Sequence, residues 1–373
     1  MRYEDAIAGY GNLDRFRKLM LRAGKGNTMN MVFLGGSITQ DCITTVHEKC
    51  YAHLVYDWWC LQYPGSRFNY INAGVGGTTS QYGAARAERD VAAYDPDFIV
   101  VEFSVNDKAD RFFQETYEGL LRKLLCLPSE PAILIVNTVQ YENGVNAQKY
   151  HNELAEYYGI PVCSMKNILY KAVIKGELDA GRFTVDMLHP NDYGHMMMAD
   201  IIDYMLSEIQ KKTAEEKIDK YVFPEKPFTR NGFEDSVCLQ NDNYRPAGKG
   251  FTIDRHKRRM IKEIFVGGWT SSKEGAYLKF EAECSSIAVQ YRKTIKQPSP
   301  IAEAVIDGDE EHPVILDGNF DERWGDCLFI SNVAVHMPYG HHTVRIKLTE
   351  THDNDVTPFY LVSVIVSKNP DER

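Results

Sequence analysis

The sequence predicts an α/β fold, a doubly wound parallel sheet with a C-terminal β-sandwich domain. Two observations predict it. Up to about residue 212, short apolar runs alternate with helical stretches, and this alternation is typical of a parallel sheet that carries helices on both faces. From about residue 276, short strands follow one another with Gly, Pro, Asp and Asn turns between them, which is typical of a β-sandwich.

Five apolar runs in the first part of the chain are predicted strands, because β-branched residues follow one another in them without polar alternation. These runs cover residues 31–35, 68–74, 97–104, 132–139 and 160–165. Helices are predicted between and after them, over residues 51–63, 83–94, 115–127, 146–159 and 194–211. Gly159 is the expected C-cap of the fourth helix, since Pro161 follows it closely.

The segment 211–232 is charged and carries two prolines, so we expect a linker that runs over the surface. The strands predicted beyond it cover residues 276–283, 286–292, 301–308, 341–350 and 359–367. The chain is therefore divided into an α/β domain over residues 1–212, a linker over 213–233 and a β-sandwich domain over 234–373.

The chain of 373 residues has a formal net charge of -10, which argues against binding to a nucleic-acid backbone, because that needs a basic face. No apolar stretch approaches the roughly 18 to 20 residues of a membrane span, and the acidic N-terminal residues do not form a secretory signal. The eight cysteines are scattered without a C-x-x-C pair. We therefore expect a cytoplasmic protein with reduced thiols that binds neither nucleic acid nor membrane.

Polar residues follow the predicted strands at the C-terminal strand ends, where a parallel sheet gathers reactive groups. Ser37 comes after the first strand in a Gly-Gly turn, Gly77 follows the second, and Asn106 follows the third. Asp186 and His189 precede the last helix. We expect these segments to meet at one edge of the sheet.

These residue types supply what acyl transfer needs. Ser37 can attack a carbonyl, but a serine hydroxyl needs a base, and the imidazole of His189 can take its proton. Asp186, three residues earlier, can hold the imidazole in the required tautomer and stabilise the imidazolium. The backbone N–H groups of Ser37 and Gly77 and the side-chain amide of Asn106 can donate to an oxyanion, and one such donor contributes about 10²- to 10³-fold in kcat.

Each of these residues also has a non-catalytic interpretation, but together they favour the acyl-transfer site. Ser37 alone is more often a helix N-cap than a nucleophile, and the two roles are compatible here. His195 is interpreted as an ordinary helix residue, and a zinc site of His189 and His195 is disfavoured because no further Cys or Glu falls at ligand spacing. The loop after Asn72 lacks both G-x-G-x-x-G and a following Lys-Ser/Thr, which argues against a nucleotide site. No metal or organic cofactor is expected.

The order of these segments resembles the SGNH hydrolase superfamily, also called GDSL esterases, over about residues 29 to 210. Its four invariant groups map onto Ser37, Gly77, Asn106 and His189, with Asp186 in its D-x-x-H motif. The resemblance implies a flavodoxin-like sheet and a serine esterase. Two motifs depart from the family pattern, since G-D-S reads G-G-S here and G-x-N-D reads S-V-N-D. Neither departure touches a group that does chemistry, and both fit carbohydrate-esterase branches better than the lipase branch.

The C-terminal part, about residues 265 to 368, resembles the jelly-roll modules attached to carbohydrate esterases and to carbohydrate-binding modules, on motifs in 304–308, 339–351 and 359–366. Trp324 lies in the charged, turn-like segment DERWGDC. Two alternatives stay open for it: an exposed ring that stacks on a sugar, or a core residue of the sandwich. Our hypothesis is that its loop leans over Ser37 and helps to choose the substrate.

The combination of the two parts resembles the intracellular two-domain mannan O-acetylesterases of carbohydrate esterase family 17. We therefore predict a serine esterase that removes O-acetyl groups from acetylated manno-oligosaccharides through an acetyl-enzyme intermediate. Three alternatives stay open. One is an esterase or thioesterase on other acyl esters, such as acetylated xylo-oligosaccharides or small lipids, and another is an inactive sugar-binding protein. The third gives the β-sandwich an assembly role in a homo-oligomer.

Overall fold

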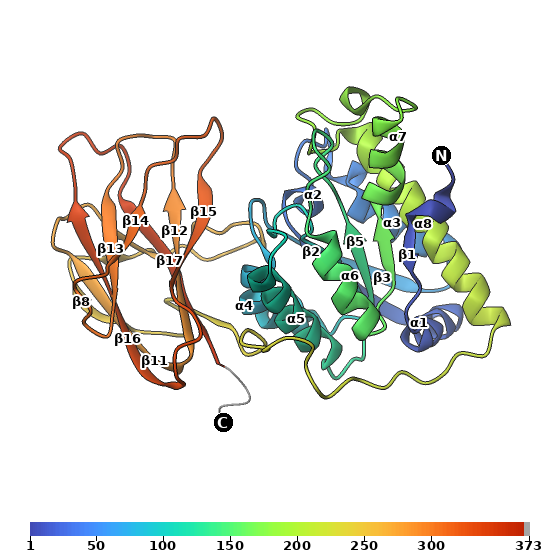
Figure 1. The fold of residues 1–373 in the computed structure, drawn as a ribbon, viewed down its shortest axis with the longest axis horizontal. Helices are drawn as coiled ribbons and strands as arrows, with labels where there is room; N and C mark the ends of the chain where they lie inside the picture. The colour runs from blue at the N-terminus through green and yellow to red at the C-terminus, as the bar shows by residue number, and fades with distance from the viewer. Residues whose placement is uncertain (369–373) are drawn as a thin grey trace. The chain divides into compact units, whose positions relative to one another are not determined.

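The computed structural model describes residues 1–368. The chain forms two compact units, Met1–Thr229 and the residues from Arg230 onward. Figure 1 shows that the first contains both helices and strands, whereas the second is built from strands. The predicted sandwich domain extends to residue 373, and its end, residues 369–373, lies outside the described residues.

The first unit is built on a six-stranded sheet. Its strands are β1 (Ile7–Gly9), β2 (Thr28–Gly35), β3 (Arg67–Gly74), β4 (Phe98–Glu102), β5 (Ala132–Asn137) and β6 (Val162–Ser164). Their order is β1-β6-β5-β4-β2-β3, with β1 antiparallel at one edge and the other five parallel. The parallel sheet is therefore confirmed. The chain leaves β2 for β3 on one side and reaches β4 on the other, so the C-terminal end of β2 is the topological switch point, where such folds bind ligands.

Helices cover both faces of this sheet, as a doubly wound fold requires. They are α1 (Asp14–Gly24), α2 (Ser37–Gln40), α3 (Tyr51–Gln62), α4 (Ser80–Asp90), α5 (Arg111–Leu125), α6 (Gln148–Tyr157), α7 (Lys171–Ile174) and α8 (Asp192–Glu215). Helices α1, α3 and α8 pack on one face, and α4, α5 and α6 cover the other (Figure 1).

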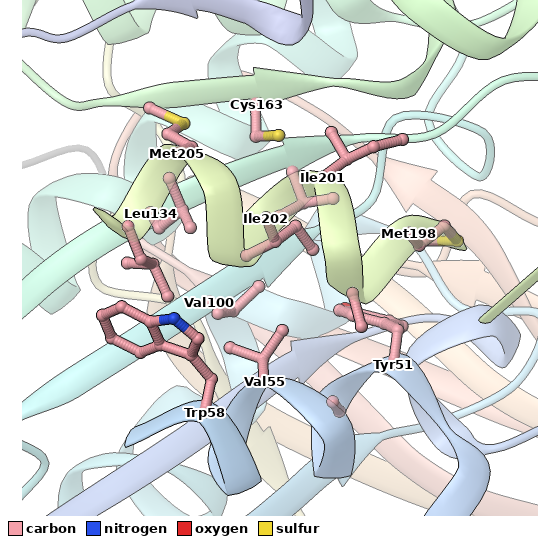
Figure 2. Packing of buried hydrophobic residues seen from close by; sticks show 14 of the residues in the cluster. Tyr51, Val55, Trp58, Val100, Leu134, Cys163, Met198, Ile201, Ile202 and Met205 are labelled. Atoms are coloured by element: carbon pink, nitrogen blue, oxygen red, sulfur yellow. The ribbon is translucent and has the colours of Figure 1, made fainter. Parts of the chain in front are cut away.

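The core beneath α3 and α8 holds these helices to the sheet (Figure 2). Figure 2 labels Tyr51, Val55 and Trp58 of α3, Met198, Ile201, Ile202 and Met205 of α8, and Val100, Leu134 and Cys163 of the strands that these helices cover. All are buried, and a large apolar side chain stabilises the fold by about 1.5–3 kcal/mol when it leaves water. This packing fixes the start of α8, and with it the loop that precedes α8.

In the first unit, the strand β1 and the helices α1, α2 and α7 are not among the predicted elements. Helix α1 reads as a charged segment, but its buried residues Phe16, Leu19, Met20 and Ala23 recur at spacings of three and four. That spacing places them on one helix face. The signal was therefore present in the sequence, although arginines and lysines stand between the apolar residues.

The segment that we expected to be a linker is attached to the first unit over most of its length. Helix α8 ends at Glu215, beyond the predicted boundary at residue 212. Glu118 of α5 accepts hydrogen bonds from the backbone N–H groups of Phe228 and Thr229 at 2.5 and 2.7 Å. The compact unit ends at Thr229, because these bonds satisfy the backbone of an irregular segment on the surface of α5.

The second unit is a β-sandwich of two antiparallel sheets, as predicted. Its strands are β7 (Val237–Leu239), β8 (Ala247–Lys249), β9 (Thr252–Ile253), β10 (Trp269–Ser271), β11 (Tyr277–Cys284), β12 (Ser286–Lys293), β13 (Ile301–Ile306), β14 (Val314–Asp317), β15 (Cys327–Ala334), β16 (Gly340–Glu350) and β17 (Phe359–Ser367). One sheet has the order β15-β12-β17-β10-β9, with β7 on β17, and the other has the order β14-β13-β16-β11-β8. Trp269, Phe280 and Tyr291 belong to the buried cluster between the sheets.

All eight cysteines are free thiols. Burial raises the pKa of Cys50 and of Cys163 to about 12, so these two thiols behave as small apolar core residues. No helix within residues 1–368 is both long and apolar enough to cross a membrane.

Candidate active site

The predicted nucleophile lies in the turn between β2 and α2. Strand β2 ends at Gly35, and Ser37 is the first residue of α2 with Gly36 as the N-cap. Ser37 is therefore not itself the N-cap, which corrects that interpretation. Both glycines are required, because a Cβ at Gly35 would collide with Thr39 and a Cβ at Gly36 would collide with the side chain of Asn106.

Three side chains form a continuous chain of hydrogen bonds at this turn. The Oγ of Ser37 lies 2.9 Å from Nε2 of His189, and Nδ1 of His189 lies 2.6 Å from Oδ2 of Asp186. Since Nδ1 faces a carboxylate it carries the ring proton, which leaves Nε2 to accept the proton of the serine. The arrangement contains a nucleophile, a base and a group that orients the base, all within hydrogen-bond reach.

The loop that carries Asp186 and His189 is held at both ends. Thr184 and Pro190 form an isolated β-bridge across it, and Asn191 caps α8 directly after it through its side-chain oxygen. Within the loop, Oδ1 of Asp186 accepts from the backbone N–H of His189 at 2.7 Å. The same carboxylate therefore fixes the loop backbone and the imidazole ring.

The pKa of Asp186 lies below its ordinary value. Partial burial acts to raise this pKa, but hydrogen bonds from the ring and backbone of His189, and from the backbone N–H of Leu188, outweigh the burial. The carboxylate consequently stays ionised throughout the pH range in which a neutral imidazole can act as a base.

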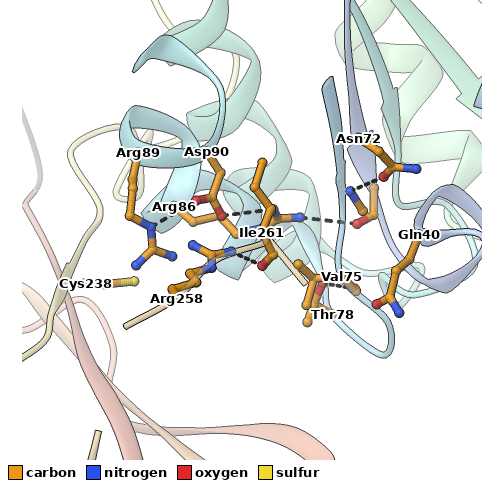
Figure 3. Close-up of polar contacts among 12 residues, drawn as sticks. Gln40, Asn72, Val75, Thr78, Arg86, Arg89, Asp90, Cys238, Arg258 and Ile261 are labelled. Carbon is orange, nitrogen blue, oxygen red and sulfur yellow. Dashed lines mark hydrogen bonds and ion pairs between the residues drawn. The ribbon is translucent and has the colours of Figure 1, made fainter. Parts of the chain in front are cut away.

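The loop after β3 lies against Ser37. A Cβ placed on Gly76 would lie 3.6 Å from the Cβ of Ser37, and the N–H of Gly76 donates to Oε1 of Gln40 at 2.5 Å. Gly77 follows with φ at 68°, a left-handed conformation that favours glycine. Asn72, labelled with Gln40 in Figure 3, supports the loop by accepting from a backbone N–H two residues later at 2.8 Å. The predicted donor Gly77 is thereby placed in the segment that flanks the serine.

Asn106 lies in the turn after β4, on the other side of the nucleophile. The neighbouring Asp107 ties this turn to α4 and α6, because it accepts from the N–H of Ser80 at 2.8 Å and lies 3.1 Å from Nε2 of His151. The amide of Asn106 packs against Gly36, and its oxygen is buried with no hydrogen-bond partner within residues 1–368. Since no group among the described residues holds this oxygen, the amide can turn its N–H₂ toward an oxyanion formed at Ser37.

Two buried charged residues beside the nucleophile were missed by the sequence analysis. Glu102 is fully buried at the end of β4, and burial raises its pKa to about 7 because it disfavours the ionised form. Arg86 of α4 is buried and pairs with Asp90 at 3.3 Å (Figure 3). For Glu102 a signal existed, since a lone glutamate stands among the apolar residues of 98–103.

His195 lies in α8 as expected, but it is fully buried. Its Nδ1 accepts a hydrogen bond from the backbone N–H of Tyr51 at 3.2 Å. Burial lowers the pKa of His195 to about 4, so the ring is neutral and fastens the start of α3 to α8. It takes no part in the chain of hydrogen bonds at Ser37.

Trp324 lies in the loop between β14 and β15 of the second unit. Its side chain is 53% exposed, and it contacts Phe320 edge-on with 5.0 Å between ring centroids. Of the two alternatives for Trp324, the core position is therefore wrong. An exposed indole on a loop can stack on an apolar sugar face. Within residues 1–368, no group of three or more His, Cys, Asp or Glu side chains is arranged to hold a metal ion.

Comparisons with known proteins agree with this geometry. The profile of the GDSL-like Lipase/Acylhydrolase family matches residues 33–197. The acetylxylan esterase of Geobacillus stearothermophilus is 27% identical over 205 residues, which cover 47% of this chain and 92% of that protein. A crystal structure of a two-domain esterase active on acetylated mannans is 45% identical, covers 99% of both chains and superposes with a TM-score of 0.95. The chain belongs to the GDSL-like lipase/acylhydrolase family.

A second crystal structure, of such a two-domain esterase co-crystallised with mannopentaose, is also 45% identical, with 99% of this chain and 98% of that chain covered and a TM-score of 0.95. Members of the GDSL family are hydrolases, and this chain is a serine esterase. Ser37 and His189 both lie inside the range that matches the family profile. The similarity to the two-domain esterases extends over both units, so it includes the β-sandwich as well as the α/β unit.

Proposed function

We propose that this serine esterase removes O-acetyl groups from acetylated manno-oligosaccharides. The observation that carries the proposal is the hydrogen-bonded row of Ser37, His189 and Asp186 at the switch point of the sheet. The substrate class follows from similarity, because a relative that matches both units at 45% identity is active on acetylated mannans.

In the first half of the reaction, Oγ of Ser37 attacks the acetyl carbonyl carbon while Nε2 of His189 takes the hydroxyl proton. Asp186 stabilises the imidazolium that forms. The oxyanion accepts hydrogen bonds from the N–H groups of Ser37 and Gly77 and from the amide of Asn106. The tetrahedral intermediate then expels the sugar oxygen, which receives its proton from Nε2, and an acetyl ester remains on Ser37.

In the second half, a water molecule attacks the acetyl ester on Ser37, and Nε2 of His189 takes the water proton. The second tetrahedral intermediate uses the same donors. It collapses to acetic acid, which ionises to acetate, and the serine regains its proton from the imidazolium. Every proton and acyl transfer in the cycle is served by side chains and backbone groups of this chain.

The decisive experiment measures acetate release from acetylated manno-oligosaccharides and from acetylated xylo-oligosaccharides, with Ser37→Ala as the control. Release from the manno-oligosaccharide, lost in Ser37→Ala, is the expected result. Equal release from both substrates would widen the function to a general sugar deacetylase. Release from neither, together with hydrolysis of an aryl acetate, would contradict the carbohydrate substrate and leave an esterase for other acyl esters.

Trp324 is proposed to supply a stacking surface for the sugar chain, because an exposed indole offers a large apolar face. Trp324→Ala should weaken turnover of acetylated oligosaccharides and leave hydrolysis of a small aryl acetate unchanged. Phe329→Ala is a matched control, since Phe329 is an exposed aromatic residue on a strand of the same unit. If both variants turn over the acetylated oligosaccharide as fast as the wild type, Trp324 has no role in binding.

Two further expectations remain predictions. A cytoplasmic location is tested by cell fractionation, and a homo-oligomer is tested by sedimentation of the purified protein. A binding module or an inactive sugar-binding protein would predict that the wild type hydrolyses no acetyl ester at all.

A further inference from the structure

The peptide bond between Gly35 and Gly36 is held at both of its polar ends by buried charged side chains. Its carbonyl oxygen, on Gly35, accepts from Nη2 of Arg86 at 3.2 Å. Its N–H, on Gly36, interacts with the carboxyl group of Glu102. Gly36 alone separates this peptide bond from Ser37, the residue that carries the nucleophile.

The arginine reaches this peptide from α4. Its side chain is fully buried, and its Nη1 lies 3.3 Å from Oδ2 of Asp90 one helical turn later. The carbonyl oxygen of Gly35 also accepts from the N–H of Val75 at 3.0 Å. The planar guanidinium of Arg86 can therefore donate to the carboxylate of Asp90 and to the carbonyl oxygen of Gly35 at the same time. A lysine ammonium on its flexible stem cannot do this with the same geometry.

The glutamate reaches the same peptide from the neighbouring strand, since Glu102 stands opposite Gly35 in the register of β2 and β4. Its carboxyl group also accepts from the hydroxyl of Thr138 at 2.6 Å and from the hydroxyl of Thr39 at 3.4 Å. Thr39 belongs to α2, the short helix that begins with Ser37. The carboxyl group thus contacts the turn before the serine and the helix after it.

A buried charged group costs stability unless it is well paired, and a polar network of this kind rigidifies the groups that it joins. Rotation of the Gly35–Gly36 peptide would move both the Oγ and the N–H of Ser37. The first must stay within reach of His189, and the second must point at the oxyanion. Small displacements of such groups are expensive, because catalysis depends on near-attack geometry.

We propose that Arg86 and Glu102 are positioning residues for the nucleophile, which act by holding the Gly35–Gly36 peptide, one residue before Ser37, from opposite ends. The inference rests on the proposed role of Ser37 as the nucleophile. Neither residue touches the reacting atoms. They act on the rate through the orientation of the serine and its backbone N–H.

The surroundings of Glu102 matter for any experiment that changes pH. The groups that face it are Asp107 in the turn after β4, Tyr51 of α3 and Tyr117 of α5, with Thr39 and Thr138 as direct hydrogen-bond donors. The kinetic comparison is therefore made at one pH, and the variants are compared with matched substitutions elsewhere in the same unit.

The chain offers such matched positions on α5. Glu118 is a buried carboxyl that accepts from the backbone N–H groups of Phe228 and Thr229. Arg122 is a buried arginine that donates to the backbone carbonyls of Pro224 and Glu225 at 3.1 and 3.2 Å. Substitutions at these two positions remove similar buried interactions with the backbone, but not at the nucleophile turn.

The experiment measures kcat and KM for an aryl acetate, the labelling rate of Ser37 by a serine-directed phosphonate, and Tm. Glu102→Ala should lower kcat and the labelling rate by about 10²-fold and Arg86→Lys by about tenfold, with KM nearly unchanged. Glu102→Gln keeps an acceptor for the N–H of Gly36 and should restore most of kcat. Glu118→Ala and Arg122→Lys should lower Tm without a comparable loss of kcat.

The proposal is overturned if Glu102→Ala and Glu118→Ala lose kcat to the same extent at a similar loss of Tm. If Glu102→Ala does not fold, the comparison of Arg86→Lys with Arg122→Lys decides in the same way, and Glu102→Gln must remain active. Failure of the proposed function is visible earlier and separately. In that case the wild type neither hydrolyses the aryl acetate nor becomes labelled at Ser37.

Discussion

Asp186 binds His189 at two places. Its Oδ2 lies 2.6 Å from Nδ1 of the ring, and its Oδ1 accepts from the backbone N–H of His189 at 2.7 Å. A carboxylate three residues before a histidine can make both contacts only if the chain turns sharply between them, and Met187 has a positive φ of 62° in this turn. The D-x-x-H spacing is therefore a structural unit that sets the loop and the ring tautomer together.

The first prediction concerns this carboxylate. Asp186→Asn should lower kcat by about 10²- to 10⁴-fold, because an amide N–H₂ facing Nδ1 favours the tautomer whose Nε2 carries the proton and cannot accept one. KM for an aryl acetate should change little. Steady-state kinetics check this, with Asp192→Asn as the control, since Asp192 is a nearby carboxylate that binds Thr45 and Lys49 instead. A variant Asp186→Asn with wild-type kcat would remove Asp186 from the mechanism.

The second prediction concerns the amide beside Gly36. Asn106→Ala should lower kcat by about 10²- to 10³-fold, the usual effect of losing one oxyanion donor. The labelling rate by a phosphonate should fall as well, because the phosphonyl oxygen occupies the same place. Asn137→Ala is the matched control, since Asn137 is a buried amide whose Nδ2 binds Asn152. Equal kinetics of the two variants would argue that the oxyanion is held by backbone N–H groups alone.

The third prediction follows from the raised pKa of Glu102, which is about 7 in the folded protein against about 4.3 in an unfolded chain. Between these values the folded state binds more protons than the unfolded state, so this group lowers stability as pH rises. Glu102→Gln does not titrate. Its stability relative to the wild type should therefore increase by roughly 3 kcal/mol from pH 4.5 to pH 7.5. Urea denaturation at several pH values measures this, with the exposed Glu88→Gln as the control. A difference that does not change with pH would contradict it.

The fourth prediction follows from the lowered pKa of His195, about 4 in the folded protein against about 6.5 unfolded. The unfolded state binds the additional proton here, so this group lowers stability as pH falls from 6.5 to 4. His195→Gln should lose roughly 3 kcal/mol less than the wild type over that interval. Exposed His312→Gln should follow the wild type. Because Glu102 and His195 act with opposite signs over the same interval, the wild type hides both effects and only the variants separate them.

Much of the fold could be read from periodicity. The strands around 31–35 and 132–139 are long apolar runs, and buried runs of this kind admit few other structures. Helix α1 was not predicted, because its apolar residues are spread among basic ones. The segment up to Thr229 was assigned to a linker because prolines and charges are typical of surface loops, whereas its attachment depends on Glu118 of α5, more than a hundred residues away.

The candidate site also contains residues that the sequence predicts and residues that it does not. The sequence predicts a site of five residues because each of them follows a recognisable strand or precedes a recognisable helix, and because few residue types act as nucleophile, base or oxyanion donor. These residues are Ser37, Gly77, Asn106, Asp186 and His189. Glu102 and Arg86 could not be assigned a place from local sequence. A buried charge is stable only when distant parts of the chain supply its partners, and periodicity does not report those partners.

Local sequence was enough to predict the parallel strands in their order along the chain, the turn that presents Ser37 and the candidate reacting groups. These are local properties, set by side-chain spacing and by the conformational freedom of glycine. The packed fold was needed to show that Arg86 and Glu102 hold the Gly35–Gly36 peptide, that His195 is a neutral core residue and that Trp324 is exposed. Each of these depends on burial and on partners far along the chain, such as the 51 positions between Gly35 and Arg86, and burial is a property of the packed fold.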